Sequence, residues 1–157
     1  MSQAVQTKIA PIQHTVVVNK SADDAFRAFT AEMIKWWPKD YGIGGSPLTD
    51  LVIEPRVGGR YYECGENSVE TPWGEVRRWE PGKRVVLAWR INAQFAYEPA
   101  LDTEVDVRFV DQAGGCCVSF EHRGLEALGE AAEAARASLN NGWGMLLGRF
   151  KEHTETA

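Results

Sequence analysis

The sequence lacks several features that would assign the protein to a membrane or to nucleic acid. It contains no apolar run of the roughly 20 residues that a membrane-spanning helix needs. Residues 1–13 contain no apolar stretch of the kind that forms a secretory signal. The net charge of −5 opposes binding to phosphates or anionic lipids. These absences predict a cytoplasmic protein with neither a membrane nor a nucleic-acid partner.

Metal and cofactor motifs are also missing. The three cysteines, Cys64, Cys116 and Cys117, lack the paired spacing of a zinc site or a disulfide framework. Adjacent strand residues point to opposite faces, so Cys116 and Cys117 cannot both bind one metal. The nucleophile elbow of hydrolases, the phosphate-binding loop and the dinucleotide-binding glycine motif are absent. We therefore expect no metal, no cofactor and three reduced thiols.

The sequence does have the composition of an ordinary globular protein, with 44% apolar and 25% charged residues. Its 157 residues suffice for one domain, and no linker or repeat divides them. We expect a single domain over residues 1–157, in which residues 1–10 form a loosely ordered tail.

The first structural elements are a strand and two short helices. Residues 12–19 are rich in β-branched side chains and predict a strand. Ser21 and Asp24 form a capping box that opens a helix. A second helix is expected over residues 31–37, where Pro38 ends it.

A glycine-rich loop over residues 41–47 precedes short extended runs separated by turn signals, which is typical of an antiparallel meander. The expected strands cover residues 51–54, 60–65, 68–80, 84–92, 101–109 and 116–123. In the last strand, alternation places Phe120 and His122 on the same apolar face as Cys116 and Val118.

The C-terminal segment has a helical period. One apolar stripe contains Leu139, Trp143, Leu146, Leu147 and Phe150. Residues 125–137 favour a helix, but Asn140, Asn141 and Gly142 are poor helix formers. We expect a break near residues 138–142 and the firmest helix over residues 141–153.

Six motifs in this order resemble a known family. They are Ser21-Ala-Asp-Asp-Ala-Phe26, Trp36-Trp37-Pro38, Val57-Gly-Gly-Arg-Tyr-Tyr62, Gly74-Glu-Val76, Trp79-Glu-Pro-Gly-Lys-Arg-Val-Val-Leu-Ala-Trp89, and Gly142-Trp143 with Leu147 and Phe150. Together they resemble the bacterial single-domain members of the activator of Hsp90 ATPase homologue 1-like family, within the SRPBCC superfamily.

The resemblance implies an α+β helix-grip fold of the START or Bet v 1 type. In that fold, a curved antiparallel sheet of six to seven strands wraps around a long C-terminal helix, with two short helices after the first strand. Relatives in the superfamily hold apolar molecules in a cavity between sheet and helix. The eukaryotic co-chaperone has a further N-terminal Hsp90-binding domain for which these 157 residues have no room, so an Hsp90 interaction is not expected.

The leading functional hypothesis is the binding of a small apolar or amphipathic molecule in such a cavity. The expected lining residues are Tyr62, Trp73, Trp89, Phe109, Phe120, His122, Trp143, Leu147 and Phe150. His122 or Tyr62 would supply the polar contact. Gly144 and Gly148 either leave space beside the helix or permit close packing of helix on sheet, and the sequence leaves both open.

The second hypothesis is an enzyme of the cyclase, hydratase or lyase kind, which recurs in the superfamily. His122 could act as a general base, or its ring could be satisfied by a backbone carbonyl. Glu63 could be a buried acid, or it could be exposed or paired with Arg60 or Arg77. The sequence leaves open whether Tyr62 or Glu63 faces inward.

The third hypothesis is an interaction module. An exposed Trp36-Trp37-Pro38 corner would form an apolar patch that binds a partner or forms a homodimer. Burial of both tryptophans under the last helix would remove that surface.

Overall fold

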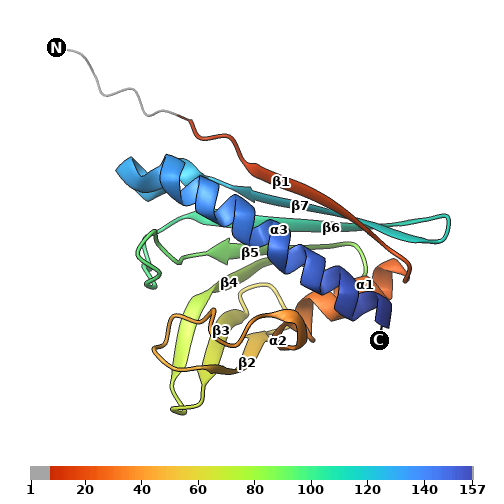
Figure 1. The fold of residues 1–157 in the computed structure, drawn as a ribbon, viewed down its shortest axis with the longest axis horizontal. Helices are drawn as coiled ribbons and strands as arrows, with labels where there is room; N and C mark the ends of the chain where they lie inside the picture. Colours follow the sequence, from red (N-terminus) through yellow and green to blue (C-terminus); the bar gives the residue numbers. More distant parts are fainter. Residues whose placement is uncertain (1–7, 157) are drawn as a thin grey trace.

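The computed structural model describes residues 8–156 and shows a seven-stranded antiparallel sheet curled around one long helix (Figure 1). The elements are β1 (Ile12–Val18), α1 (Ala22–Thr30), α2 (Met33–Trp36), β2 (Leu48–Ile53), β3 (Arg60–Gly65), β4 (Glu70–Glu80), β5 (Arg84–Trp89), β6 (Thr103–Gln112), β7 (Gly115–Arg123), the 3-10 helix η1 (Leu125–Ala131) and α3 (Ala132–Thr156). The strand order is β1-β7-β6-β5-β4-β3-β2, so β1 and β2 are the edges. The predicted helix-grip architecture is confirmed.

The start of α1 and the end of α2 follow from local chemistry, although α2 begins at Met33 rather than at the predicted residue 31. Ser21 caps α1, because its hydroxyl accepts a hydrogen bond from the Asp24 backbone N–H at 3.1 Å. Trp37 after α2 is extended, at φ −86° and ψ 131°, as expected of a residue before proline. Of the expected tail, residues 1–7 lie outside the described part of the chain. The segment that follows is tied down, since the Ala10 carbonyl accepts a bond from Arg136 at 2.7 Å.

Two bulges in β4 help to curl the sheet. Tyr61 pairs with Gly74 and Tyr62 with Pro72, which leaves Trp73 as an extra residue in β4. A second extra residue, Arg77, disturbs the pairing of β4 with β5. A bulge bends its strand and turns the extra side chain to a new direction. Here the first bulge delivers Trp73, which is buried, to the concave side.

The long helix differs from the prediction. Residues 138–142 continue α3 without the expected break, and the interruption lies earlier, at Gly129, whose φ is 72°. Glycine and asparagine disfavour a helix by at most about 1 kcal/mol each, and burial of an apolar stripe outweighs that cost. Trp143, Leu147 and Phe150 supply this burial. Figure 1 shows α3 running diagonally across the sheet.

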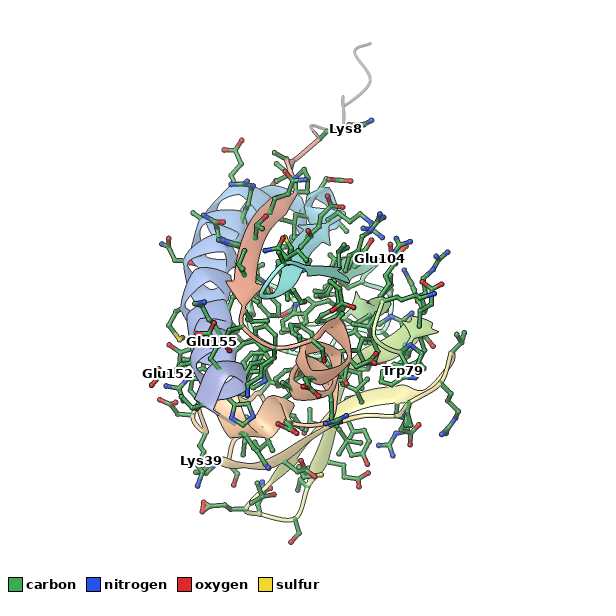
Figure 2. All side chains as sticks on the ribbon, turned by 90° about the vertical axis from the view of Figure 1, so that its right-hand side faces the viewer. Lys8, Lys39, Trp79, Glu104, Glu152 and Glu155 are labelled. Atoms are coloured by element: carbon green, nitrogen blue, oxygen red, sulfur yellow. The ribbon has the colours of Figure 1, made fainter. Side chains whose placement is uncertain are left out.

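The other face of the sheet carries charged side chains, among them Glu104 and Asp106 of β6. Figure 2 shows Glu104 on this side, with α3 across the interior from it. Asp106 is nearly covered, because Arg84 binds both of its carboxylate oxygens at 2.9 and 2.7 Å and Arg123 adds a bond of 2.9 Å. Burial alone would raise the pKa of Asp106, but the bonds from both arginines lower it.

Candidate functional site

Most of the residues predicted to line a cavity meet in one aromatic cluster between the sheet and α3. The rings of Phe120 and Trp143 lie 4.5 Å apart between centroids, and those of Trp89 and Trp143 lie 5.3 Å apart. Trp73 contacts Trp89 at 5.6 Å. All four side chains are buried, as are Phe109, Leu147 and Phe150. The rings therefore fill this part of the interior with one another.

His122 lies inside this cluster, with both ring nitrogens engaged. The Trp143 indole N–H can only donate, so at 3.2 Å it requires a lone pair on Nδ1 of His122. The proton of the neutral ring is then on Nε2, 3.0 Å from the Thr103 hydroxyl oxygen. That hydroxyl donates in turn to the Trp89 carbonyl at 2.7 Å. Burial lowers the pKa of His122 to about 3, so the ring is neutral at pH 7.

Glu63 is also fully buried, which is the first of the two alternatives that the sequence left open for it. Its Oε1 accepts bonds from the Trp73 indole at 2.8 Å and from the Ile43 amide at 2.6 Å. Its Oε2 accepts a bond from the Gly44 amide at 3.1 Å. The carboxylate thus fastens the glycine-rich loop over residues 41–47 onto β3 and β4. A Cβ at Gly42 would lie 2.8 Å from Oε2, so this loop needs glycine to wrap the carboxylate closely.

Tyr62 does not belong to the interior, and its assignment to the cavity lining is wrong. Because Glu63 and Tyr61 face inward on β3, the side chain of Tyr62 lies on the opposite face, where it is half-buried. The Arg60 guanidinium lies 3.9 Å from the centroid of its ring. The inward tyrosine is Tyr61, which contacts the Trp73 ring at 5.3 Å.

The tryptophan corner is buried rather than exposed. Trp36 and Trp37 contact α3 through Phe150 and Trp143, at centroid distances of 5.5 and 5.7 Å. The Trp36 indole donates to the Ala28 carbonyl at 2.8 Å. The apolar surface on which the interaction-module hypothesis depends is therefore inside the fold.

A groove of about 450 Å³ lies between β1 and α3. It is lined by His14, Thr15, Val16 and Val17 of β1 and by Gly144, Leu147, Gly148 and Lys151 of α3. Leu147 is the member of the predicted cavity lining that contributes to it. The groove therefore lies at the edge of the sheet, beside the aromatic cluster rather than inside it.

The two helix glycines in this groove are not required for packing. Among the described residues, a Cβ at Gly148 would meet no atom within 4 Å. A Cβ at Gly144 would meet only Cε1 of His14, at 3.6 Å, which is an ordinary contact. Of the two explanations that the sequence left open, the structure supports the first, in which the glycines leave space beside the helix.

Side chains from α3 hold β1 at both ends of the groove. Arg136 donates to the carbonyls of Ala10 and Pro11 at 2.7 and 3.1 Å. At the other end, Lys151 donates to the Val17 carbonyl at 2.6 Å and pairs with Glu155 at 2.8 Å. Between these two clamps, α3 presents Gly144 and Gly148 to the strand.

His14 is a groove residue that the sequence did not distinguish. Its Nε2 is shielded from solvent and has no hydrogen-bond partner within residues 8–156. The ring lies 6.3 Å from that of Phe120. The sequence carried no signal for this state, because it depends on Gly144, which α3 brings to β1 from the far end of the chain.

Two further properties bear on the kind of site. No helix within residues 8–156 is long and apolar enough to cross a membrane. Over the same range, no three side chains of His, Cys, Asp and Glu gather where they could hold a metal ion.

Comparison with solved structures places this geometry among known proteins. The chain is 31% identical to the anthrahydroquino-γ-pyrone synthase Txn09, complexed with SUM, over 92% of this chain and 97% of that one, with a TM-score of 0.66. It is 27% identical to CalC, a self-sacrificing resistance protein from Micromonospora echinospora, over 93% and 94% of the two chains, with a TM-score of 0.70.

A third relative shows the fold alone. The Aha1 protein from Colwellia psychrerythraea, solved as a dimer, is 18% identical over 94% of this chain and 97% of that one, with a TM-score of 0.66. Among curated proteins, none matches. A family model, Activator of Hsp90 ATPase homolog 1-like protein, matches residues 19–155. The chain therefore belongs to the Activator of Hsp90 ATPase homolog 1-like family.

Proposed function

We propose that this protein binds a small, largely apolar molecule in the groove between β1 and α3. The observation that carries the proposal is the pair of helix glycines that line the groove without a packing role. Each glycine costs a helix about 1 kcal/mol relative to alanine. Two such residues on one face of α3 keep open a volume of about 450 Å³, which is within the range of small-molecule sites.

The relatives support a small-molecule role. The synthase that shares 31% of its residues with this chain was solved in a complex with SUM. CalC, at 27% identity, is named as a resistance protein. We extend to this chain only the general class, the binding of a small molecule.

The structure gives no support to catalysis by His122 or Glu63. His122 has both ring nitrogens bonded to protein groups, so neither is free for a substrate. Glu63 likewise has both oxygens occupied by N–H donors. The two residues that the sequence offered as acid or base therefore serve the interior of the fold, and we assign neither a catalytic role.

The experiment that tests the proposal is a binding titration with N-phenyl-1-naphthylamine, an uncharged apolar dye, followed by its fluorescence. We expect saturable binding to the wild type that Gly148→Leu weakens at least about tenfold, because the leucine fills the groove. Gly142→Leu is the matched control: a Cβ there also meets no described atom within 4 Å, but the residue does not line the groove. Equal weakening by both variants, or no binding by the wild type, would refute the proposal.

Two expectations from the sequence accompany this function as predictions. One is a cytoplasmic location. The other is a homodimer, for which the dimeric Aha1 relative is a precedent in the fold. Native mass spectrometry of the purified protein counts the subunits and detects any small molecule that has co-purified.

A further inference from the structure

We infer that the groove selects molecules that carry a neutral oxygen, a hydroxyl or a carbonyl, and that His14 is the residue that recognises it. The inference rests on the proposed function, since it specifies the ligand of the same groove. It starts from the contrast among the three histidines. His122 bonds through both nitrogens, and Nε2 of His153 lies 2.7 Å from Glu32, whereas Nε2 of His14 has no partner within the described chain.

An unpartnered buried nitrogen is uncommon in folded proteins, because burial removes its bonds to water without replacing them. The remaining described surroundings of His14 do not supply a bond. Phe120 presents an aromatic ring at 6.3 Å, and Gly144 presents no side chain at all. A ligand oxygen that reaches this nitrogen would therefore complete a hydrogen bond that the protein leaves unmade.

The position of Gly144 gives the oxygen a place to sit. The point where a side chain would begin at residue 144 lies 3.6 Å from Cε1 of His14, the carbon to which Nε2 is bonded. Because Nε2 is shielded from solvent in the structure, the imidazole must turn toward this space for Nε2 to meet a ligand oxygen. Leu147 lines the same groove and offers apolar contact for the rest of the molecule. The arrangement fits a ligand with an apolar body and one polar atom at the His14 end.

Charge in the groove favours a neutral oxygen over a carboxylate. The cation that lines it, Lys151, is already held by the Glu155 carboxylate at 2.8 Å and by the Val17 carbonyl at 2.6 Å. An anionic ligand would have to compete with Glu155 for this ammonium, and the protein carries a net charge of −5. An imidazole nitrogen can donate to a carbonyl or accept from a hydroxyl, depending on its tautomer, so it suits either neutral group.

The test compares 2-naphthol with 2-methylnaphthalene, two probes of nearly equal shape in which a hydroxyl replaces a methyl group. We expect the wild type to bind 2-naphthol about three- to tenfold more tightly, the range of one hydrogen bond to a neutral group. In His14→Phe this preference should vanish while 2-methylnaphthalene still binds. His14→Gln, which keeps a hydrogen-bonding group, should retain part of the preference and serves if the phenylalanine variant does not fold.

A second measurement reports on the contact directly. The imidazole ¹⁵N chemical shifts of His14 should move when 2-naphthol is added and stay in place with 2-methylnaphthalene, with the shifts of His122 as an internal reference. If both probes bind and His14→Phe keeps the preference, the role of His14 is refuted while the groove remains a binding site. If neither probe binds the wild type, the groove itself fails as a site for apolar molecules, and this inference fails with it.

Discussion

The indole nitrogen of Trp143 donates to Nδ1 of His122 over 3.2 Å and so joins the closing helix to the centre of the sheet. Because Trp143 can only donate and burial lowers the pKa of His122 to about 3, the histidine is neutral in the folded protein down to acidic pH. The unfolded chain takes up a proton near pH 6.5, the ordinary value. Acid therefore favours the unfolded state.

The first prediction follows from that difference. Between about pH 6 and pH 4, His122 should contribute a loss of about 1.4 kcal/mol of unfolding free energy per pH unit, since only the unfolded state binds the proton. The contribution of His122 to the unfolding free energy is constant above about pH 7, and its loss is complete near pH 3. Urea titrations at several pH values measure it. His122→Gln lacks this proton uptake, so its unfolding free energy should fall by about 1.4 kcal/mol less per pH unit over this range. An unchanged dependence on pH would contradict the assignment.

The second prediction concerns the buried carboxylate. Glu63→Gln replaces one acceptor oxygen by an NH₂ group that must face an N–H donor from Trp73, Ile43 or Gly44. We expect a loss of about 2 kcal/mol of stability and faster hydrogen exchange of the Ile43 and Gly44 amides. Glu66→Gln makes the same chemical change at an exposed site and should do neither. If both amides still exchange slowly in Glu63→Gln, the hydrogen bonds of Glu63 are not what holds the loop in place.

A third prediction uses two glycines with opposite surroundings. Gly148→Ala should raise the unfolding free energy by about 0.5–1 kcal/mol, because the residue is helical and its Cβ would meet nothing within 4 Å. Gly74→Ala should lower it by about 3 kcal/mol or more, because a Cβ there would clash with the Ala88 carbonyl oxygen. Thermal melts of both variants beside the wild type measure the contrast. Destabilisation by Gly148→Ala would mean that the groove glycine serves packing after all.

The charged face of the sheet yields a fourth prediction. Arg84→Ala leaves the nearly covered Asp106 without its two-bond partner and should cost about 2 kcal/mol. Arg108 approaches the same carboxylate at 3.9 Å from an exposed position, so Arg108→Ala should cost less than about 0.5 kcal/mol. Chemical unfolding of both variants decides this, and equal costs would show that Asp106 does not depend on Arg84.

Strict alternation made some of this structure predictable from the sequence. In residues 116–123 every second side chain is apolar or His122, and the structure buries that set. The cap at Ser21 and the helix stop at Pro38 depend on neighbouring residues alone, and both were predicted correctly. Local chemistry and period carried these predictions because nothing distant opposes them.

Other features depend on contacts that a local pattern does not contain. Tyr61 and Tyr62 are both aromatic, so the sequence of β3 did not show which of its two alternating sets of side chains faces the interior. The burial of the Glu63 carboxylate depends on hydrogen bonds from loop amides that lie 19 and 20 residues away in the sequence. The prediction of a break near residues 138–142 was wrong for a related reason. The packing of Trp143 on the sheet outweighs the weak helix propensity of Asn140, Asn141 and Gly142.

The clamps on β1 have a consequence for synthesis. Ile12 pairs with His122, and the bonds from Arg136 to Ala10 and from Lys151 to Val17 span 126 and 134 residues of chain. Long loops must close before such contacts form, which slows folding. Among the strands described, β1 is translated before the others, whereas its partners β7 and α3 follow all the other strands. Until β7 and α3 have been translated, its β-branched residues stay unpaired, and during that interval the nascent chain is most exposed to aggregation.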